Sequence, residues 1–124
     1  MKETLRSKTI LIVDDEPLFC EVLSNFLEKF GYHPVMATNG REAFEKVRDQ
    51  KFDLVLSDIR MPGGDGLEFL EKAREWDFTL PIIVFVSDCS ELTPEKALSK
   101  GAVGYFAKPF DMKELIESIS RILS

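Results

Sequence analysis

The sequence predicts an α/β fold in which a five-stranded parallel sheet carries five helices on its two faces. Five short apolar runs rich in β-branched residues alternate with stretches of helical period along the chain. Several runs are apolar at consecutive positions, as strands covered on both faces require. Alternating strands and helices are joined by right-handed crossovers, which keep the strands parallel. Together these observations indicate a doubly wound fold.

The first predicted strand, 9–13 (TILIV), is followed by the strongest helical pattern in the chain. Apolar residues recur there at the spacing of three and four that lines one face of a helix. They are Phe19, Val22, Leu23, Phe26, Leu27 and Phe30. Pro17 suits the first helical position and Gly31 suits the C-terminal stop. The second predicted strand is 33–37 (HPVMA).

The second helix is predicted over 40–50, because Asn39 and Glu42 place a capping side chain and an acidic partner three residues apart. The third strand, 53–57 (DLVLS), precedes a helix over 66–76. The apolar face of that helix carries Leu67, Leu70 and Ala73. The middle of the chain therefore repeats the order of strand and helix.

The fourth strand is predicted over 81–86 (PIIVFV) and the fifth over 102–107 (AVGYFA). A short helix lies between them, begun by Thr93 and Pro94 and ended by Gly101. The last helix spans 112–123, with Asp111 and Glu114 at its start. Its main apolar stripe leaves Ile116 and Leu123 at the side, where they suit either a partner surface or the edge of the core.

Composition limits the classes of function. A chain of 124 residues is the size of one ordinary domain. Its net charge of -6 argues against direct binding to nucleic acid or to an acidic membrane surface. No apolar segment is long enough to span a membrane, and the polar N-terminus does not resemble a signal peptide, so we expect the cytoplasm. Cys20 and Cys89 are expected to be free thiols.

Acidic residues follow three of the predicted strands, and a lysine follows another. Asp14 and Asp15 come after the first strand, Asp58 after the third and Asp88 after the fourth, while Lys108 follows the fifth. Each alone has an ordinary explanation as a turn or capping residue. Together they matter, because the carboxyl ends of parallel strands meet at one edge of the sheet, where sites form in such folds.

Carboxylates gathered at one edge would repel one another unless a cation lay among them. Oxygen ligands without a histidine or thiolate cluster favour Mg²⁺. The charges of Asp14, Asp15, Asp58, Lys108 and one Mg²⁺ sum to zero, which suits a site for a phosphoryl group. The loop after Asp58, in "SDIRMPGGDG", is rich enough in glycine to present a backbone carbonyl to a metal. Neither GxxxxGK[ST] nor GxGxxG occurs.

Four segments in this order resemble the receiver domain of two-component response regulators, from about Lys8 to Leu123. The segments are "LIVDDEP", "SDIRMPGGDG", the serine that ends the fourth apolar run, and "GYFAKPF". The resemblance implies a flavodoxin-like fold with strand order 2-1-3-4-5. It also implies a single receiver domain over residues 1–124, either stand-alone or excised from a longer regulator or hybrid kinase. The lone histidine, His33, then lies on the edge-type second strand, where a structural role is expected.

The resemblance assigns roles to the residues at the strand ends. Asp58 would accept a phosphoryl group from a phosphohistidine on a sensor histidine kinase or phosphotransfer protein. Asp15, Asp58 and the backbone carbonyl of Arg60 would bind Mg²⁺ directly, with Asp14 acting through water. Lys108 would pair with Asp58 and later with a phosphoryl oxygen, and its bond to Pro109 resembles the cis peptide of the family.

The resemblance also implies a switch. The hydroxyl of Ser87 would turn toward the phosphoryl group, and Tyr105 would rotate inward with it. This would change the surface of the fourth helix, fifth strand and fifth helix, through which a second copy or a downstream effector would bind. A half-buried strand aromatic is the ordinary alternative for Tyr105. Asp88 replaces the small residue usual in the family, and Gly64 a larger apolar one.

Asp88 is expected either to slow phosphorylation by small anionic donors, or to point to solvent or cap the following turn. The chain is thus predicted to be a phosphorylatable signalling switch and not a turnover enzyme. A docking module that works without phosphorylation is the alternative, and the intact acidic set argues against it. A Mg²⁺-dependent phosphohydrolase would need a substrate pocket that this length does not provide.

Overall fold

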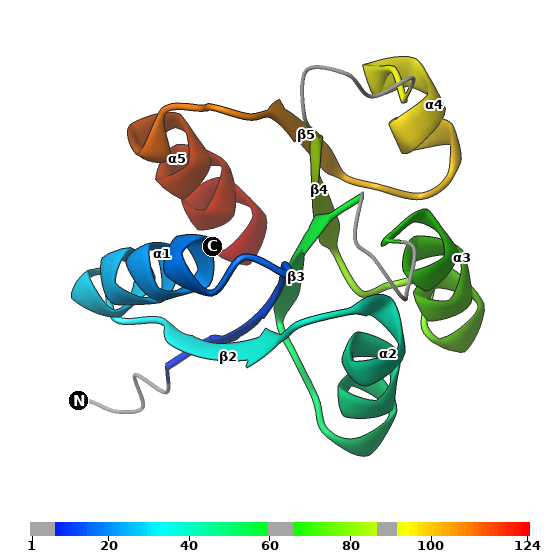
Figure 1. Ribbon diagram of the computed structural model, residues 1–124, viewed down its shortest axis with the longest axis horizontal. Helices are drawn as coiled ribbons and strands as arrows, with labels where there is room; N and C mark the ends of the chain where they lie inside the picture. The colour runs from blue at the N-terminus through cyan, green and yellow to red at the C-terminus, as the bar shows by residue number, and fades with distance from the viewer. Residues whose placement is uncertain (1–6, 60–65, 87–91) are drawn as a thin grey trace.

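The computed structural model describes residues 7–59, 66–86 and 92–124, and Arg60, Ser87, Asp88 and Cys89 lie outside them. Strands and helices alternate from one end of the chain to the other (Figure 1). The strands are β1 (Thr9–Val13), β2 (His33–Ala37), β3 (Leu54–Asp58), β4 (Ile82–Val86) and β5 (Gly104–Ala107). The helices are α1 (Pro17–Lys29), α2 (Gly40–Asp49), α3 (Gly66–Trp76), α4 (Pro94–Ser99) and α5 (Met112–Leu123).

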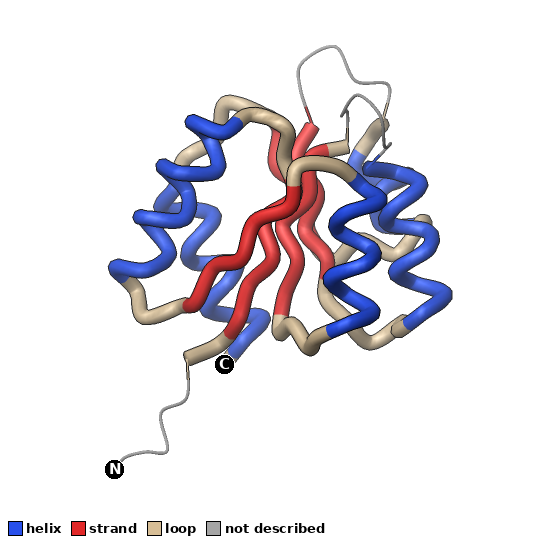
Figure 2. The backbone as a smooth tube through the Cα atoms, turned by 60° about the horizontal axis from the view of Figure 1, so that its bottom comes forward, coloured by secondary structure: helices blue, strands red, loops and turns tan. Residues whose placement is uncertain are grey.

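The strands form one sheet in the order β2-β1-β3-β4-β5, and each neighbouring pair is parallel. They run side by side between two groups of helices (Figure 2). The order reverses between β1 and β3, so their carboxyl ends flank the switch point at which such folds place a site. The predicted doubly wound fold and its strand order are confirmed.

Each face of the sheet has its own core. Helices α1 and α5 cover one face, where Leu23 and Leu27 of α1 and Ile119 of α5 are buried against the strands. Helices α2, α3 and α4 cover the other face, as Figure 1 shows. The residues of β3 and β4 are buried throughout, which explains why their sequences are apolar at consecutive positions.

The predicted boundaries need small corrections. Strand β3 begins one residue later than expected and ends at Asp58, which is therefore the last residue of the strand. Strand β4 begins at Ile82, after Pro81, and β5 begins at Gly104. Ala102 and Val103 lie in the connection between α4 and β5, and the backbone N–H of Ala102 bonds to the Ala97 carbonyl of α4. The predicted number and type of the elements are correct.

The predicted residues begin or end the helices, but the capping hydrogen bond of α5 has a different donor from that of α2. Pro17 opens α1, and Gly31 follows it with φ of 88°, a conformation that favours glycine. The Asn39 side chain accepts a hydrogen bond from the Glu42 N–H at 2.8 Å, as a capping residue does. At α5 the Asp111 carboxylate instead accepts from the N–H of Lys113, at 2.8 Å.

The apolar stripe of α1 is wider than the sheet requires. Leu23 and Leu27 are fully buried, whereas Val22 and Phe30 are about half exposed. On α5, Ile116 and Leu123 pack against the edge of the core, the second of the two predicted alternatives. His33 is exposed on β2 at the edge of the sheet. Within the described part of the chain, no helix is both long and apolar enough to cross a membrane.

Candidate phosphoryl transfer site

The acidic residues and the lysine meet at the carboxyl ends of the strands. Asp14 directly follows β1, and its backbone N–H bonds to the Ala37 carbonyl at the end of β2. Asp58 ends β3, and the backbone N–H of Lys108 donates to the Val86 carbonyl at the end of β4. These bonds extend the parallel pairing by one step, so the strand order itself brings the side chains together.

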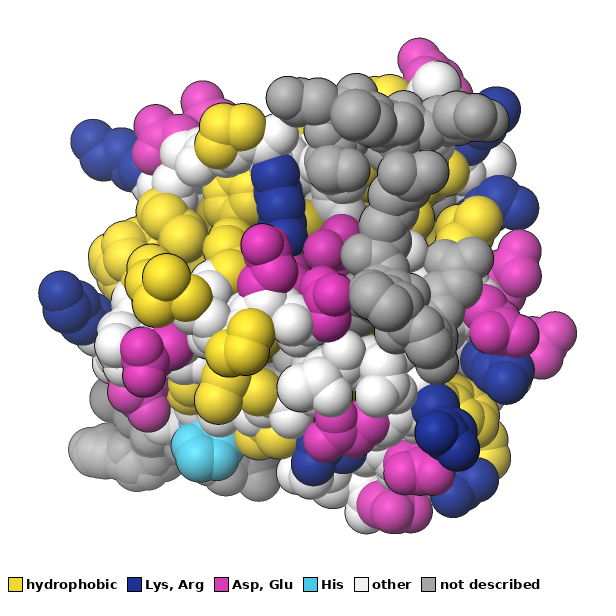
Figure 3. Space-filling view, viewed as in Figure 1, with side chains coloured by type: hydrophobic (Ala, Val, Ile, Leu, Met, Phe, Trp, Pro, Cys, Tyr) yellow, Lys and Arg dark blue, Asp and Glu magenta, His cyan; other side chains and the backbone are white. Residues whose placement is uncertain are grey.

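The three carboxylates form a compact group. Asp14, Asp15 and Asp58 each offer one oxygen, and these atoms lie within 4.8 Å of one another. The residue Asp14 is fully buried and Asp58 is 7% exposed, whereas Asp15 is exposed. Figure 3 shows acidic side chains gathered beside a basic one near the middle of the molecular face drawn in Figure 1. Such a group is suited to binding a hard cation, because carboxylate oxygens are the ligands that Mg²⁺ prefers.

The ammonium of Lys108 lies among these acids. Its Nζ is 2.7 Å from Asp14 Oδ2, 3.3 Å from Asp58 Oδ2 and 3.5 Å from Glu16 Oε1. Burial lowers the pKa of Lys108, but the hydrogen bond and charge of Asp14, followed by those of Asp58, raise it above its ordinary value overall. The lysine is therefore a fixed positive charge at neutral pH. Its shortest contact is to Asp14 and not to the predicted partner, Asp58.

The backbone around the acids holds them in place. The carboxylate of Asp14 accepts the Glu16 N–H at 2.9 Å, which fixes the turn between β1 and α1. Ser57 is a buried strand residue whose hydroxyl donates to the Asp58 carbonyl at 3.0 Å. The Ser57 hydroxyl is thus bonded to the backbone of the neighbouring residue.

The first residue of α3, Gly66, lies against the end of β3. Its N–H donates to the Ile59 carbonyl at 3.0 Å, which draws the start of the helix against the end of β3. A Cβ at position 66 would overlap the Asp58 carbonyl oxygen and would lie 2.7 Å from the Ile59 Cα. Only a glycine lets the two backbones approach this closely.

A buried thiol lies beneath the acids. Cys20 is 3% exposed, and its Sγ donates to the Asp14 backbone carbonyl at 3.4 Å. Burial, followed by the charge of Asp14, raises the pKa of this thiol to about 11. The thiol is therefore uncharged at neutral pH and acts as a small packing residue.

Tyr105 lies on β5, two strands away from Asp58 in the sheet. Its ring is half-buried against the core of the α2, α3 and α4 face. Its hydroxyl donates to the Leu92 carbonyl at 2.9 Å, just before α4. The Tyr105 side chain therefore links β5 to the segment that directly precedes α4.

The structure thus brings together Asp14, Asp15, Asp58 and Lys108, which are up to 94 positions apart in the sequence. The peptide bond between Lys108 and Pro109 is cis. The predicted roles of Arg60, Ser87 and Asp88 fall on residues outside the described part of the chain.

The sequence pattern did not single out two further residues of the site. Glu16 contributes a third carboxylate near Lys108, although its side chain is mostly exposed. Phe19 has its ring centroid 4.2 Å from the Lys108 Nζ. A signal was present, because Phe19 lies in the first turn of α1, which begins directly after the loop that carries Asp14 and Asp15 at this edge of the sheet. Its place in the apolar stripe of α1 concealed that position.

Comparison with known proteins identifies the family. Residues 10–120 match the response regulator receiver domain. The chain is 39% identical over 115 residues to the transcriptional regulatory protein ZraR of Klebsiella oxytoca. That alignment covers 93% of this chain and 26% of ZraR, so the chain spans about a quarter of the length of that relative.

Similar solved structures are also response regulators or their receiver domains. A CheY-like receiver domain protein from Methanospirillum hungatei superposes with a TM-score of 0.89 at 32% identity, over 95% of this chain and 94% of the other. The response regulator TrrA of Thermotoga maritima, solved in complex with Mg²⁺ and BeF, gives a TM-score of 0.84 at 36% identity, over 94% and 99%. These likenesses extend over nearly the whole chain and indicate a signalling switch. The chain belongs to the family of response regulator receiver domains that act in two-component signalling.

Proposed function

We propose that Asp58 is the phosphoryl acceptor of this receiver domain. The observation that carries the proposal is the position of the Asp58 carboxylate, nearly buried and 3.3 Å from the Lys108 ammonium, at the switch point of the sheet. The Lys108 Nζ also bonds to Asp14 at 2.7 Å, which keeps that ammonium directed at the acids. A carboxylate held beside a fixed cation suits a nucleophile that gains negative phosphoryl oxygens on reaction.

The donor is proposed to be a phosphohistidine on a sensor histidine kinase or a phosphotransfer protein. A lone pair of an Asp58 carboxylate oxygen forms the new P–O bond, while the P–N bond of a phosphohistidine that is protonated on its other ring nitrogen breaks and its electron pair stays on the imidazole. The products are neutral histidine and an acyl phosphate on Asp58. Lys108 lies within reach of the phosphoryl oxygens and would neutralise part of their charge. Attack by water on the phosphorus would then restore the carboxylate.

The residues present fit Mg²⁺. Asp15 and Asp58 would be direct ligands, and Asp14, which is buried and bonded to Lys108, would act through water. The ion would neutralise the oxygens of the transferred group. The complex of TrrA with Mg²⁺ and BeF, on a similar chain, supports this assignment. The predicted third ligand, the Arg60 carbonyl, is part of the same proposal.

The output is proposed to pass through the surface formed by α4, β5 and α5. The Tyr105 hydroxyl is bonded to the Leu92 carbonyl, so a rotation of the Tyr105 ring would break this bond and free the segment that leads into α4. Ser87 would couple that rotation to the phosphoryl group. A second copy of the chain or a downstream effector would then bind the altered surface, and the domain itself would make no direct contact with nucleic acid. We further propose that residues 1–124 form a single receiver domain.

The test is covalent labelling by acetyl phosphate in the presence of Mg²⁺, measured by intact mass. We expect one acid-labile phosphoryl group on the wild type, and none in Asp58→Asn or with excess EDTA. Asp53→Asn is the matched control, because Asp53 directly precedes β3, at the opposite end of the strand from Asp58. Equal labelling of Asp58→Asn would overturn the site. If neither acetyl phosphate nor a phosphorylated kinase labels the wild type, a docking module that works without phosphorylation is favoured.

A further inference from the structure

The ammonium of Lys108 contacts an aromatic ring as well as carboxylates. The Phe19 centroid is 4.2 Å from Nζ, well within the range at which a cation is attracted to the face of a ring. The lysine side chain is only 18% exposed, so little water competes for the ammonium on that side. Asp14 and Asp58 hold the ammonium by its charge, and the Phe19 ring occupies a position that water would otherwise take.

The Phe19 ring is itself fixed by other rings. It meets Phe85 edge to face at 5.8 Å between centroids and Phe110 at 6.2 Å. Phe85 and Phe110 stack on each other at 4.8 Å. Phe85 belongs to β4 and is fully buried, so this group ties α1, β4 and the segment after Lys108 together. A ring held on two sides is a rigid support for the ammonium.

We propose that Phe19 is a positioning residue that holds the Lys108 ammonium against the Asp14 and Asp58 carboxylates through a cation–π contact. The proposal rests on the proposed function, since it concerns the lysine that would receive the phosphoryl oxygens. With the ring in place, the ammonium has few positions other than those that face the acids, so less freedom is lost when the phosphoryl group arrives. Phe19 does not touch the reacting atoms.

The contact can be tested without any phosphorylation. A ring face shields the nuclei next to it, so the ε-methylene signal of Lys108 should lie upfield of the other lysine signals in a ¹H–¹³C spectrum. The signal is assigned by its loss in Lys108→Arg. We expect it to return to the range of the other lysines in Phe19→Leu and to stay upfield in Phe19→Tyr. An unshifted Lys108 signal in the wild type would show that the contact is absent and would overturn the proposal.

The functional consequence is tested by the rate of labelling with acetyl phosphate and Mg²⁺. A cation–π contact at a mostly desolvated site predicts a slowing of roughly 3- to 30-fold in Phe19→Leu. Mono-, di- and trifluorinated phenylalanine at position 19 should slow the reaction in steps, because each fluorine weakens the negative face of the ring while its shape is nearly kept. A purely structural ring would give no such series, and Phe19→Tyr should retain most of the rate.

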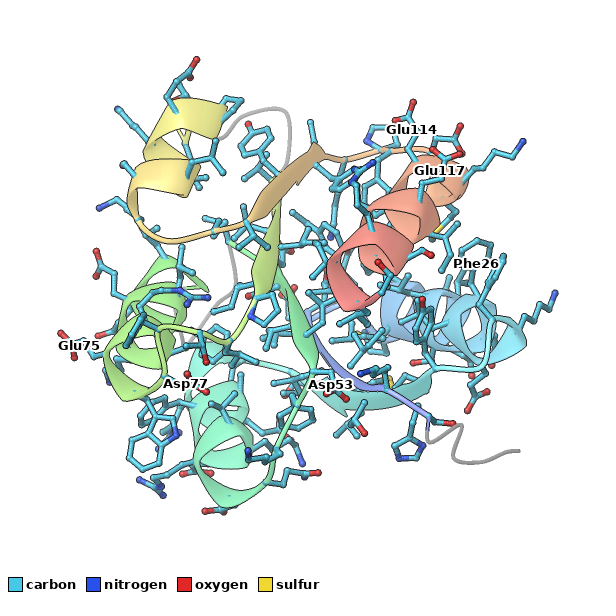
Figure 4. The ribbon with its side chains drawn as sticks, turned by 180° about the vertical axis from the view of Figure 1, so that it is seen from behind. Phe26, Asp53, Glu75, Asp77, Glu114 and Glu117 are labelled. Atoms are coloured by element: carbon cyan, nitrogen blue, oxygen red, sulfur yellow. The ribbon has the colours of Figure 1, made fainter. Side chains whose placement is uncertain are left out.

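Phe26 provides the matched control. It projects from the same helix two turns further along (Figure 4), and its ring pairs with that of Phe30 at 5.1 Å. The same fluorinated series at position 26 should leave the rate unchanged. Equal rates across the series at position 19 would overturn the proposal. If the wild type is not labelled at all, the proposed function fails, and the lysine spectrum still decides whether the contact exists.

Discussion

The two ends of the sheet hold their charged side chains in different ways. At the carboxyl end, the lysine is held by other side chains, since Lys108 Nζ is bonded to the carboxylates of Asp14 and Asp58. At the amino end, most of the partners are backbone groups. The Asp53 carboxylate accepts the Thr9 N–H at 2.8 Å, and the Arg74 guanidinium donates to the carbonyls of Phe78 and Leu80.

The amino end also has a groove of about 730 Å³, lined in part by Lys51, Trp76 and Asp77. Asp77 there accepts the N–H of Thr79 at 2.9 Å and its hydroxyl at 2.6 Å. Figure 4 shows Asp53 and Asp77 at this end, from behind the view of Figure 1.

Stability and function thus depend on charged groups at opposite ends of the sheet. A bond to the backbone is fixed by the chain, and breaking it leaves a peptide group without its partner. An ion pair between side chains can be rearranged when an ion or a phosphoryl group enters, because each partner can turn to a new one. Charges at the amino end should therefore matter for folding, and charges at the carboxyl end for ligand binding.

The largest expected effect compares two glycines, one at each end. A Cβ at Gly66 would overlap the Asp58 carbonyl oxygen, and a Cβ at Gly101 would lie 2.5 Å from the Arg74 Cδ. We expect Gly66→Ala and Gly101→Ala each to lower the free energy of unfolding, by about 3 kcal/mol for Gly66, where only backbone can yield. Labelling by acetyl phosphate should slow only in Gly66→Ala. Urea unfolding measures the stability of the two variants, and intact mass measures their rates of labelling. Equal slowing of labelling in Gly66→Ala and Gly101→Ala would contradict the idea that only the carboxyl end of the sheet serves phosphoryl transfer.

The next effect concerns Mg²⁺ binding and uses two aspartates. Asp14→Asn removes the buried partner of Lys108 and one charge of the acidic group. It should weaken Mg²⁺ binding by about 10- to 100-fold, the usual cost of losing an outer-shell partner. Asp53→Asn should leave the affinity unchanged, because Asp53 is bonded to the Thr9 backbone at the other end. Isothermal titration with MgCl₂ compares them, and similar affinities for the two variants would refute the prediction.

A smaller effect is expected from the Arg74 guanidinium. Burial lowers the pKa of this group, and its bonds join the end of α3 to the loop that leads into β4. Arg74→Met keeps the apolar stem but removes the donors, so the free energy of unfolding should fall by about 2 kcal/mol. Arg48→Met is the control, since Arg48 is half exposed and lies over the Phe44 ring. The control should change stability by less than about 0.5 kcal/mol, and neither variant should slow labelling.

The smallest effect is a pH dependence from Cys20. Its thiol has an ordinary pKa of 9.0, raised to about 11 in the folded chain by burial and then by Asp14. The unfolded chain releases this proton first, so the contribution to stability is complete below about pH 9 and is lost as the pH rises to about 11. In urea unfolding with EDTA, the wild type should lose stability more steeply over this interval than Cys20→Ala. Cys89 is present in both proteins, so its titration cancels in the comparison. Equal loss of stability with pH in the wild type and in Cys20→Ala would contradict a raised pKa of the Cys20 thiol.

Much of the fold could be read from the sequence because its signals are local. Consecutive apolar residues indicated buried strands such as β3, and the pairing of Asn39 with Glu42 marked the start of α2. The errors also have local causes. Residues 102 and 103 are apolar like the strand after them, but the N–H of Ala102 bonds back to α4, and β5 begins only at Gly104. The apolar stripe of α1 was predicted to form one buried face. Val22 and Phe30 remain half exposed, because the sheet contacts only part of that stripe.

The fold class, and the acids that gather at one edge of the sheet, could be predicted from the amino-acid sequence alone. The reason is topological, since parallel strands end on the same side and carry their following residues there. Which of these groups contact one another follows from the three-dimensional packing. Lys108 is closer to Asp14 than to Asp58, and Phe19 covers its ammonium. Those contacts depend on strand order and on packing between residues far apart in the chain, which no local pattern records.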